Sequence, residues 1–294
     1  MNSLKAAIAA YGTTSLFVLL WSSGAIFAEI GIEHAPAFAF LLLRFALASA
    51  VLAVIGAYRR KWWPARGTRW RVAITGALLT GGYSICYLLA LSRGLTPGLL
   101  AVILGAQPIL TMLATQRRYS VRRLAGLGLA VIGLALVVHP SGDGAAVSSV
   151  GAAFGLAALL CITVGALLQK RIEQAPIDVL PLQNAVSLLM CAAIAPTMPL
   201  AFKVDGPLIV SLLWLGLVIS VLAQLLFYRL VRRGDLVNVT SLFYLVPIVT
   251  AWMDYVFLGH RLDASEWLGM AAILLGLTLV VRAGDKPALR ERAG

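Results

Sequence analysis

Ten apolar runs divide the chain, and each is long enough to cross the hydrocarbon core of a bilayer as a helix. They cover residues 10–28, 38–58, 72–92, 97–116, 121–139, 149–169, 179–200, 207–228, 236–256 and 265–282. The runs lack the dyad alternation of a membrane β-barrel, and helices satisfy their own backbone hydrogen bonds in lipid. We therefore expect an all-α integral membrane protein with ten transmembrane helices. Since hydrophobic residues make up 61% of the chain, no soluble domain is expected.

The formal net charge of +12 would by itself fit a nucleic-acid partner. The Lys and Arg residues, however, fall mainly in alternate connections, at 59–71, 117–123, 170–171, 229–233 and 282–292. The positive-inside rule places these connections and both termini in the cytoplasm. The predicted partner is therefore the lipid bilayer and not a nucleic acid. The absence of a targeting or retention signal favours the bacterial inner membrane.

Short matches indicate that the chain is an internal duplication. IEHAP at 32–36 matches IEQAP at 172–176, and QPILT at 107–111 matches VPIVT at 246–250. Gly126 and Gly133 align with Gly269 and Gly276. We therefore predict two repeats, 1–145 and 146–294. Because each holds five spans, an odd number, the second must be inverted relative to the first, as in secondary transporters that work by alternating access.

These features resemble the EamA branch of the drug/metabolite transporter superfamily. The five-plus-five arrangement, the proline-centred fourth and ninth spans, and the Gly-rich last helix of each half carry the resemblance. Within that branch, the stretch SVLAQLLFYRLVRRG from Ser220 to Gly234 looks most like the YddG-type exporters of aromatic and other neutral amino acids. The resemblance implies outward net transport. His260 stands where many members carry Glu, so no role of that Glu transfers to this chain.

Aromatic and small polar residues gather at mid-depth on several spans, and we expect them to line a substrate cavity between the halves. Tyr83 and Tyr87 share a helix face, while Ser220, Gln224 and Tyr228 repeat every four residues. A helix that faces only lipid does not need such a stripe, although packing would explain each residue singly. The predicted substrate-binding set is Trp21, Ser22, Ser23, Tyr83, Ser84, Tyr87, Gln107, Thr163, Ser220, Gln224, Tyr228 and Tyr244.

Pro108 and Pro247 lie near the middle of the fourth and ninth spans. Each should kink its helix, because proline lacks a backbone N–H and clashes with the preceding turn. A cavity or a neighbouring helix must then satisfy the freed carbonyl groups. Gln107 makes either an interhelical hydrogen bond or a substrate contact.

Arg44 lies about two turns below the outer surface, where a charge costs roughly 3 kcal/mol. We expect a structural ion pair or a backbone cap, with a substrate contact as the alternative. Asp254, near the outer end of the ninth span, is one candidate partner, and Glu29 and Glu33 are the others. Asp254 could equally extend outward to the interface.

The scarcity of buried charge constrains the substrate. Phosphorylated substrates, including nucleotide sugars, would need several cations at mid-depth, and multivalent cations would need several carboxylates. A neutral or zwitterionic molecule with an apolar or aromatic side chain remains, which favours an exporter of neutral amino acids. The alternative is a multidrug exporter of lipophilic cations, which Asp254 would permit. A membrane enzyme or scaffold is disfavoured, because neither a catalytic, a nucleotide-binding nor a metal-ligand spacing is found, and no cofactor is predicted. The small residues of the spans fit packing within a monomer as well as association, so the oligomeric state stays open.

Overall fold

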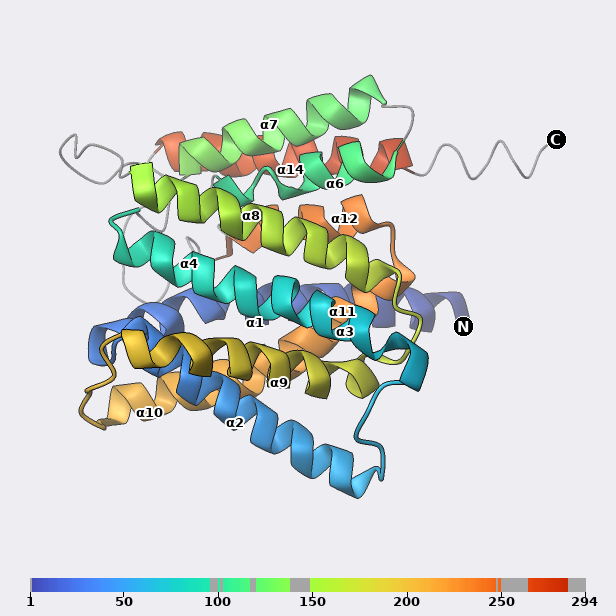
Figure 1. Cartoon of the computed structure of the whole chain (residues 1–294). Coiled ribbons are helices and arrows are strands. Elements are labelled where there is room, and N and C mark those ends of the chain that lie inside the picture. Colours follow the sequence, from blue (N-terminus) through green and yellow to red (C-terminus); the bar gives the residue numbers. More distant parts are fainter. Residues whose placement is uncertain are drawn as a thin grey trace.

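The computed structural model describes residues 2–95, 100, 103–116, 120–137, 149–246, 248–249 and 264–284. Every regular element in these ranges is a helix (Figure 1). Six helical segments are long and apolar enough to cross a membrane: Gly12–His34, Ala37–Tyr58, Arg66–Ser92, Ser149–Lys170, Pro176–Thr197 and Gly206–Arg233. The expectation of an all-helical, multi-pass membrane protein is confirmed.

The elements of the first half are α1 (Asn2–His34), α2 (Ala37–Tyr58), η1 (Arg66–Thr68), α3 (Arg69–Gly76), η2 (Ala77–Gly82), α4 (Tyr83–Ser92), α6 (Gln107–Thr115) and α7 (Val121–Val137). Those of the second half are α8 (Ser149–Lys170), α9 (Pro176–Ile194), η3 (Ala195–Thr197), α10 (Gly206–Leu213), η4 (Trp214–Ala223), α11 (Gln224–Arg233), α12 (Leu236–Ser241), η5 (Leu242–Tyr244) and α14 (Ala264–Gly284). Consecutive elements join into two long continuous helices, one formed by η1, α3, η2 and α4 and the other by α10, η4 and α11.

Both of these long helices contain a π-helical segment, which the sequence did not indicate. The segments are η2 and η4. At the 140-residue offset of the repeat, residues 77–82 correspond to 217–222, which lie inside η4. Thr80 and Ser220 therefore hold equivalent positions in the two segments. Wide turns of this kind are rare and frequently lie at functional sites.

The chain around Pro108 breaks and does not kink within one helix, so the expectation for the fourth span is corrected. Residues 103–104 are helical, Gly105 and Ala106 form a turn, and α6 begins at Gln107 with Pro108 in its first turn. Proline is well tolerated there because the first N–H groups of a helix have no intrahelical partner. Pro247 lies outside the described residues.

Helices α7 and α14 lie side by side and run antiparallel (Figure 1). A Cβ built on Gly126 would lie 2.7 Å from the carbonyl oxygen of Gly276, and one built on Gly276 would lie 2.5 Å from that of Gly126. A Cβ on Gly133 would lie 2.6 Å from the carbonyl oxygen of Gly269. Only glycine allows backbones this close. The predicted repeat exchanges Gly126 with Gly269 and Gly133 with Gly276, so the Gly126–Gly276 contact and the Gly133–Gly269 contact are counterparts of each other.

The two halves of the chain interleave. Helix α2 packs against α9, α4 packs against α8, and α7 packs against α14, so each pair joins one half to the other (Figure 1). Contacts also come in equivalent pairs: α2 with η4 matches α9 with η2, and α1 with η4 matches α8 with η2. Neither half therefore forms a separate lobe.

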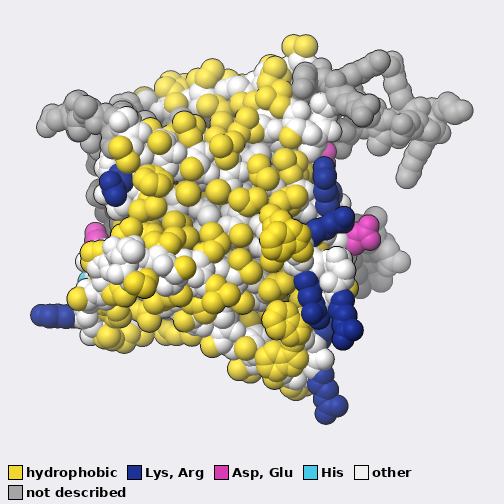
Figure 2. Space-filling model, viewed as in Figure 1, with side chains coloured by type: hydrophobic (Ala, Val, Ile, Leu, Met, Phe, Trp, Pro, Cys, Tyr) yellow, Lys and Arg dark blue, Asp and Glu magenta, His cyan; other side chains and the backbone are white. Residues whose placement is uncertain are grey.

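The surface is apolar over the length of the helices. Figure 2 shows this band, with most of the visible Lys and Arg side chains at one end of the molecule. Helix α1 begins, and α14 ends, at that same end, which we call the basic end (Figure 1). The opposite end is called the far end. Exposed apolar side chains such as Val54, Leu160 and Leu189 are those expected to face lipid.

Candidate substrate site

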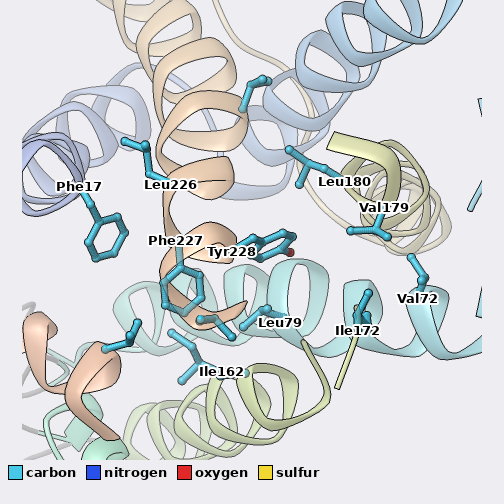
Figure 3. Close-up of a cluster of buried hydrophobic side chains, with 14 of the residues drawn as sticks. Phe17, Val72, Leu79, Ile162, Ile172, Val179, Leu180, Leu226, Phe227 and Tyr228 are labelled. Carbon is cyan, nitrogen blue, oxygen red and sulfur yellow. The ribbon is translucent and has the colours of Figure 1, made fainter. Parts of the chain in front are cut away.

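Four aromatic side chains meet toward the basic end of the bundle. Phe17 and Trp21 come from α1, Phe227 from α11 and Phe243 from η5. Every pair among them is in contact, with ring centroids 5.3 to 6.0 Å apart. We call this group the aromatic cluster; Figure 3 labels Phe17 and Phe227 within it. Of these four residues only Trp21 was predicted, because a lone Phe in an apolar helix is indistinguishable from lipid-facing or core residues.

A polar network adjoins the aromatic cluster. Tyr228 is fully buried beside Phe227, and its ring projects toward the helix that carries Leu79 (Figure 3). Its hydroxyl lies 3.5 Å from the Thr80 hydroxyl, and the Gln224 side chain lies close to it. Tyr228 and Gln224 were predicted site residues, whereas Thr80 was missed. Its signal was available, because Thr80 is the repeat equivalent of Ser220.

Ser220 makes the equivalent contact on the other π segment with a different partner. Its hydroxyl accepts a hydrogen bond of 2.8 Å from Nε of Arg44 on α2 and donates one of 2.8 Å to the Leu215 carbonyl. The sequence placed Ser220, Gln224 and Tyr228 on one stripe. In the structure the residues of that stripe contact different partners: Ser220 contacts Arg44, and Tyr228 contacts Thr80.

Arg44 points toward the middle of the bundle. Ser220 lies near the centre of the 28-residue segment Gly206–Arg233, while Arg44 itself lies about two turns from the start of α2. No carboxylate of a described side chain forms an ion pair with Arg44. Of the expected partners, Glu33 is exposed, and Asp254 and the Glu29 side chain lie outside the described part. The expected ion pair is therefore not found among described side chains.

Two tyrosines adjoin Arg44 and extend toward the far end. The rings of Tyr83 and Tyr87 are 5.8 Å apart, as their spacing predicts. The Tyr83 and Cys191 side chains both lie close to Arg44. Ser84, between the two tyrosines, is buried. Arg44, Ser220, Tyr83 and Tyr87 thus form the second group of predicted residues that the fold brings together.

The hydroxyls of α1 and α8 mostly bond to backbone. Ser22 donates to the Val18 carbonyl at 2.7 Å and to that of Val246 at 3.4 Å. Ser23 donates to the Leu20 carbonyl and accepts from the Trp214 indole N–H at 2.9 Å. Thr163 donates to the Leu159 carbonyl at 2.7 Å. Such back-bonding satisfies hydroxyls within lipid-embedded helices, and it gives these three residues a structural explanation.

The break in the fourth span leaves polar groups that need partners. Tyr244 is buried and donates its hydroxyl to the Gly105 carbonyl at 2.5 Å. A neighbouring helix, and not a cavity, therefore satisfies one carbonyl at the break. Gln107 is also buried, and its amide Nε2 has no hydrogen-bond partner among the described residues. A buried unpaired amide is costly, so Gln107 is suited to meet a ligand.

Ion pairs join the halves at the basic end. Asp178 of α9 accepts from Arg59 at 2.8 Å and from Lys61 at 2.6 Å. Arg123 of α7 donates to Asp235, the N-cap of α12, and to Asn238 at 2.7 Å. These contacts were not predicted, because their partners are more than 100 residues apart in sequence.

Comparisons with known proteins agree with one another. Residues 9–139 and 149–282 each match the EamA-like transporter family. The chain is 26% identical to a "Probable amino-acid metabolite efflux pump" of Salmonella typhimurium, covering 90% of this chain and 92% of that protein. It is 24% identical to a protein of the same name from Escherichia coli, again over 90% and 92%. It is 23% identical to the "Uncharacterized transporter YvbV" of Bacillus subtilis, over 90% and 89%.

The fold is also found in a solved crystal structure whose title names no activity. The TM-score is 0.75 at 20% identity, and the match covers 91% of this chain and 94% of the other. At this identity the likeness concerns the fold alone.

Proposed function

Because the chain belongs to the EamA-like transporter family, we propose that it is a secondary transporter that exports neutral and aromatic amino acids by alternating access. The observation that carries the substrate class is the relation to two proteins named probable amino-acid metabolite efflux pumps, which extends over 90% of the chain. The grouping of tyrosines, hydroxyls and one cation in the bundle fits a zwitterion with an aromatic side chain.

The proposed architecture is ten transmembrane helices in two inverted repeats. The family matches the chain in two successive ranges of similar length. The glycine contacts between α7 and α14 are symmetric under exchange of the halves, and the π segments hold equivalent places. Inverted repeats supply two related arrangements of one bundle, which alternating access requires.

The basic end is proposed to face the cytoplasm of the bacterial inner membrane. The concentration of Lys and Arg at this end supports that orientation, since cytoplasmic connections carry an excess of cations (Figure 2). Both α1 and α14 have their terminal ends there, so both chain termini are expected in the cytoplasm.

We further propose that this structure represents a state closed toward the cytoplasm. The aromatic cluster and the ion pairs of Asp178 and Asp235 all lie toward the basic end. At the offset of 139–140 residues, the counterparts of the aromatic cluster are Ala157, Cys161, Tyr87 and Leu104. Only one of these four is aromatic. The aromatic contacts at the basic end therefore have few counterparts among the described residues of the far end.

Counterflow in proteoliposomes tests the substrate class. Vesicles loaded with unlabelled phenylalanine should accumulate labelled phenylalanine and threonine in a protein-dependent way. Tyr83→Ala and Gln107→Ala should each lower that accumulation, while Tyr58→Ala, at a 91% exposed position, should not. Empty liposomes give the background. A wild-type protein that accumulates neither amino acid would refute the proposed substrate class.

The multidrug alternative has less support in the described part of the chain. The described acidic side chains all lie at or near helix ends or in connections, at Glu33, Glu173, Asp178, Asp205 and Asp235. A lipophilic cation would instead meet Arg44 at mid-depth and be repelled. Ethidium counterflow that is abolished by Asp254→Asn would favour the alternative.

A further inference from the structure

We propose that Arg44 is the carboxylate-binding residue of the transport site, so that the protein selects organic acids and amino acids that carry a free carboxylate attached to an apolar side chain. This rests on the proposed function for the location of the site. It goes beyond it in assigning one charge as the determinant of specificity.

Among the described residues, no side chain or backbone group hydrogen-bonds to the terminal nitrogens of Arg44. A guanidinium has five N–H donors in a planar fork. Nε donates to Ser220, and neither terminal nitrogen makes a hydrogen bond to a described residue. The two terminal nitrogens present the pair of parallel donors that a carboxylate accepts.

The position of Arg44 argues against a purely structural role. An arginine this close to a helix end normally extends its head group to the nearer interface. Here the side chain extends instead to Ser220, near the middle of the Gly206–Arg233 segment. The titratable side chains that lie close to it are those of Tyr83 and Cys191, which are neutral groups. An isolated cation held inward by neutral groups is stabilised when an anion binds beside it.

Ser220 acts as a positioning residue for this cation. Its hydroxyl donates to the Leu215 carbonyl in the π segment, which directs its lone pairs at Arg44 Nε. The equivalent position of Arg44 in the other half is Asn184, which is neutral. The cation is therefore present once per chain and gives the substrate one orientation relative to Tyr83 and Tyr87.

The test uses four ligands with the same ring and a changed polar end: phenylalanine, 3-phenylpropionate, phenylalaninamide and phenethylamine. The midpoint of thermal unfolding of the purified full chain is measured with each. Phenylalanine and 3-phenylpropionate, which carry a carboxylate, should raise the midpoint of the wild type. Phenylalaninamide and phenethylamine, which lack a carboxylate, should not. Arg44→Gln should lower carboxylate affinity about 10-fold to 100-fold, the range for a charge-assisted pair.

Two variants serve as controls. Arg44→Lys keeps the charge without the planar fork and should retain part of the affinity, which keeps the test valid if Arg44→Gln folds poorly. Arg123→Gln removes a buried arginine that is bound by Asp235 and Asn238, so it should lower the unfolding midpoint but leave the carboxylate preference intact.

The outcomes separate this inference from the proposed function. Equal stabilisation by amines and carboxylates, an unchanged response in Arg44→Gln, or no response to any ligand each overturns the role of Arg44. Phenylalanine counterflow with unchanged KM in Arg44→Gln overturns it too, while the amino-acid exporter stands. If 3-phenylpropionate binds through Arg44 but no amino acid exchanges, the carboxylate site stands and the amino-acid function fails.

Discussion

The hydroxyl of Tyr244 donates a hydrogen bond of 2.5 Å to the carbonyl oxygen of Gly105, a residue 139 positions earlier. These two residues hold equivalent positions in the two halves, because Pro108 and Pro247 are related by the same offset. In the proposed inverted repeat, a contact between equivalent positions lies close to the axis that relates the halves. One half supplies a glycine with an accessible carbonyl, and the other supplies a side chain long enough to reach it.

Replacing Tyr244 by Phe should destabilise the folded protein by about 1 to 3 kcal/mol, because the buried Gly105 carbonyl would lose its partner. The free energy of unfolding, measured by denaturant titration in mixed micelles, checks this. Tyr58→Phe makes the same chemical change at an exposed position and should have no effect. An equal effect of the two variants would contradict the role of the hydrogen bond.

Gly126→Ala and Gly276→Ala should each destabilise the chain by about 1 to 3 kcal/mol, since the added methyl group would overlap a carbonyl oxygen of the facing helix. Gly128 provides a matched control in the same helix, because a Cβ there meets no atom within 4 Å. Gly128→Ala should be neutral or stabilising by up to about 1 kcal/mol, owing to the higher helix propensity of alanine. The same unfolding titration measures all three, and destabilisation by Gly128→Ala of equal size would refute the contact.

Asp178→Asn should shift the protein away from the state closed at the basic end. The carboxylate is nearly buried and accepts from both Arg59 and Lys61, which belong to the other half of the chain. Without its charge the two cations lose the group that holds them at α9. Since alternating access couples opening of one end to closure of the other, the far end should close more often.

We propose the native thiols of Cys86 and Cys161 as reporters of this shift. They lie within hydrogen-bonding distance of each other on α4 and α8, and both are half-buried. Their rate of alkylation by a membrane-impermeant maleimide added from outside should fall severalfold in Asp178→Asn. Glu173→Gln, an exposed change in the adjacent connection, should leave the rate unaltered. A rate that rises in Asp178→Asn would reverse the assignment of the closed end.

Ser220→Ala should weaken binding of 3-phenylpropionate about fivefold, the equivalent of about 1 kcal/mol for one hydrogen bond that orients Arg44. Adding Ser220→Ala to Arg44→Gln should not weaken binding further, because Ser220 acts only through its hydrogen bond to Arg44 and Arg44→Gln already removes that bond. Thr278→Val, at an exposed position of α14 whose hydroxyl donates only to the Leu275 carbonyl, should leave the affinity unchanged. Additive losses from Ser220→Ala and Arg44→Gln would show that Ser220 does not act through Arg44.

The hydrophobic pattern was sufficient to predict the helical membrane class. Length and composition determine which segments lipid can accommodate, and no tertiary contact is needed for that step. The spacing of Tyr83 and Tyr87 likewise predicted their contact, because a regular helix relates residues four apart. The π segments were not foreseeable, since the glycines and small polar residues in ALLTGG and WLGLVISVLA occur equally in regular transmembrane helices.

The pairing of site residues could not be predicted, because it depends on how the halves interleave. Ser220 and Tyr228 lie on one expected stripe, yet they contact α2 and η2 respectively. The expected kink at Pro108 is a break, because a turn at Gly105 lets the proline occupy the start of a new helix. Asp254 and Pro247 lie outside the described residues, so their roles stay predictions.

The glycine contact between α7 and α14 supplies a fixed reference for distance spectroscopy. With carbonyl oxygens seated against glycine Cα atoms, neither helix can rotate or slide without a steric clash. Ile132 on α7 and Leu275 on α14 are both exposed and can carry spin labels. The distance between those labels should stay constant with or without substrate. A distance that changes elsewhere in the same molecule can then be attributed to transport and not to the solubilising medium.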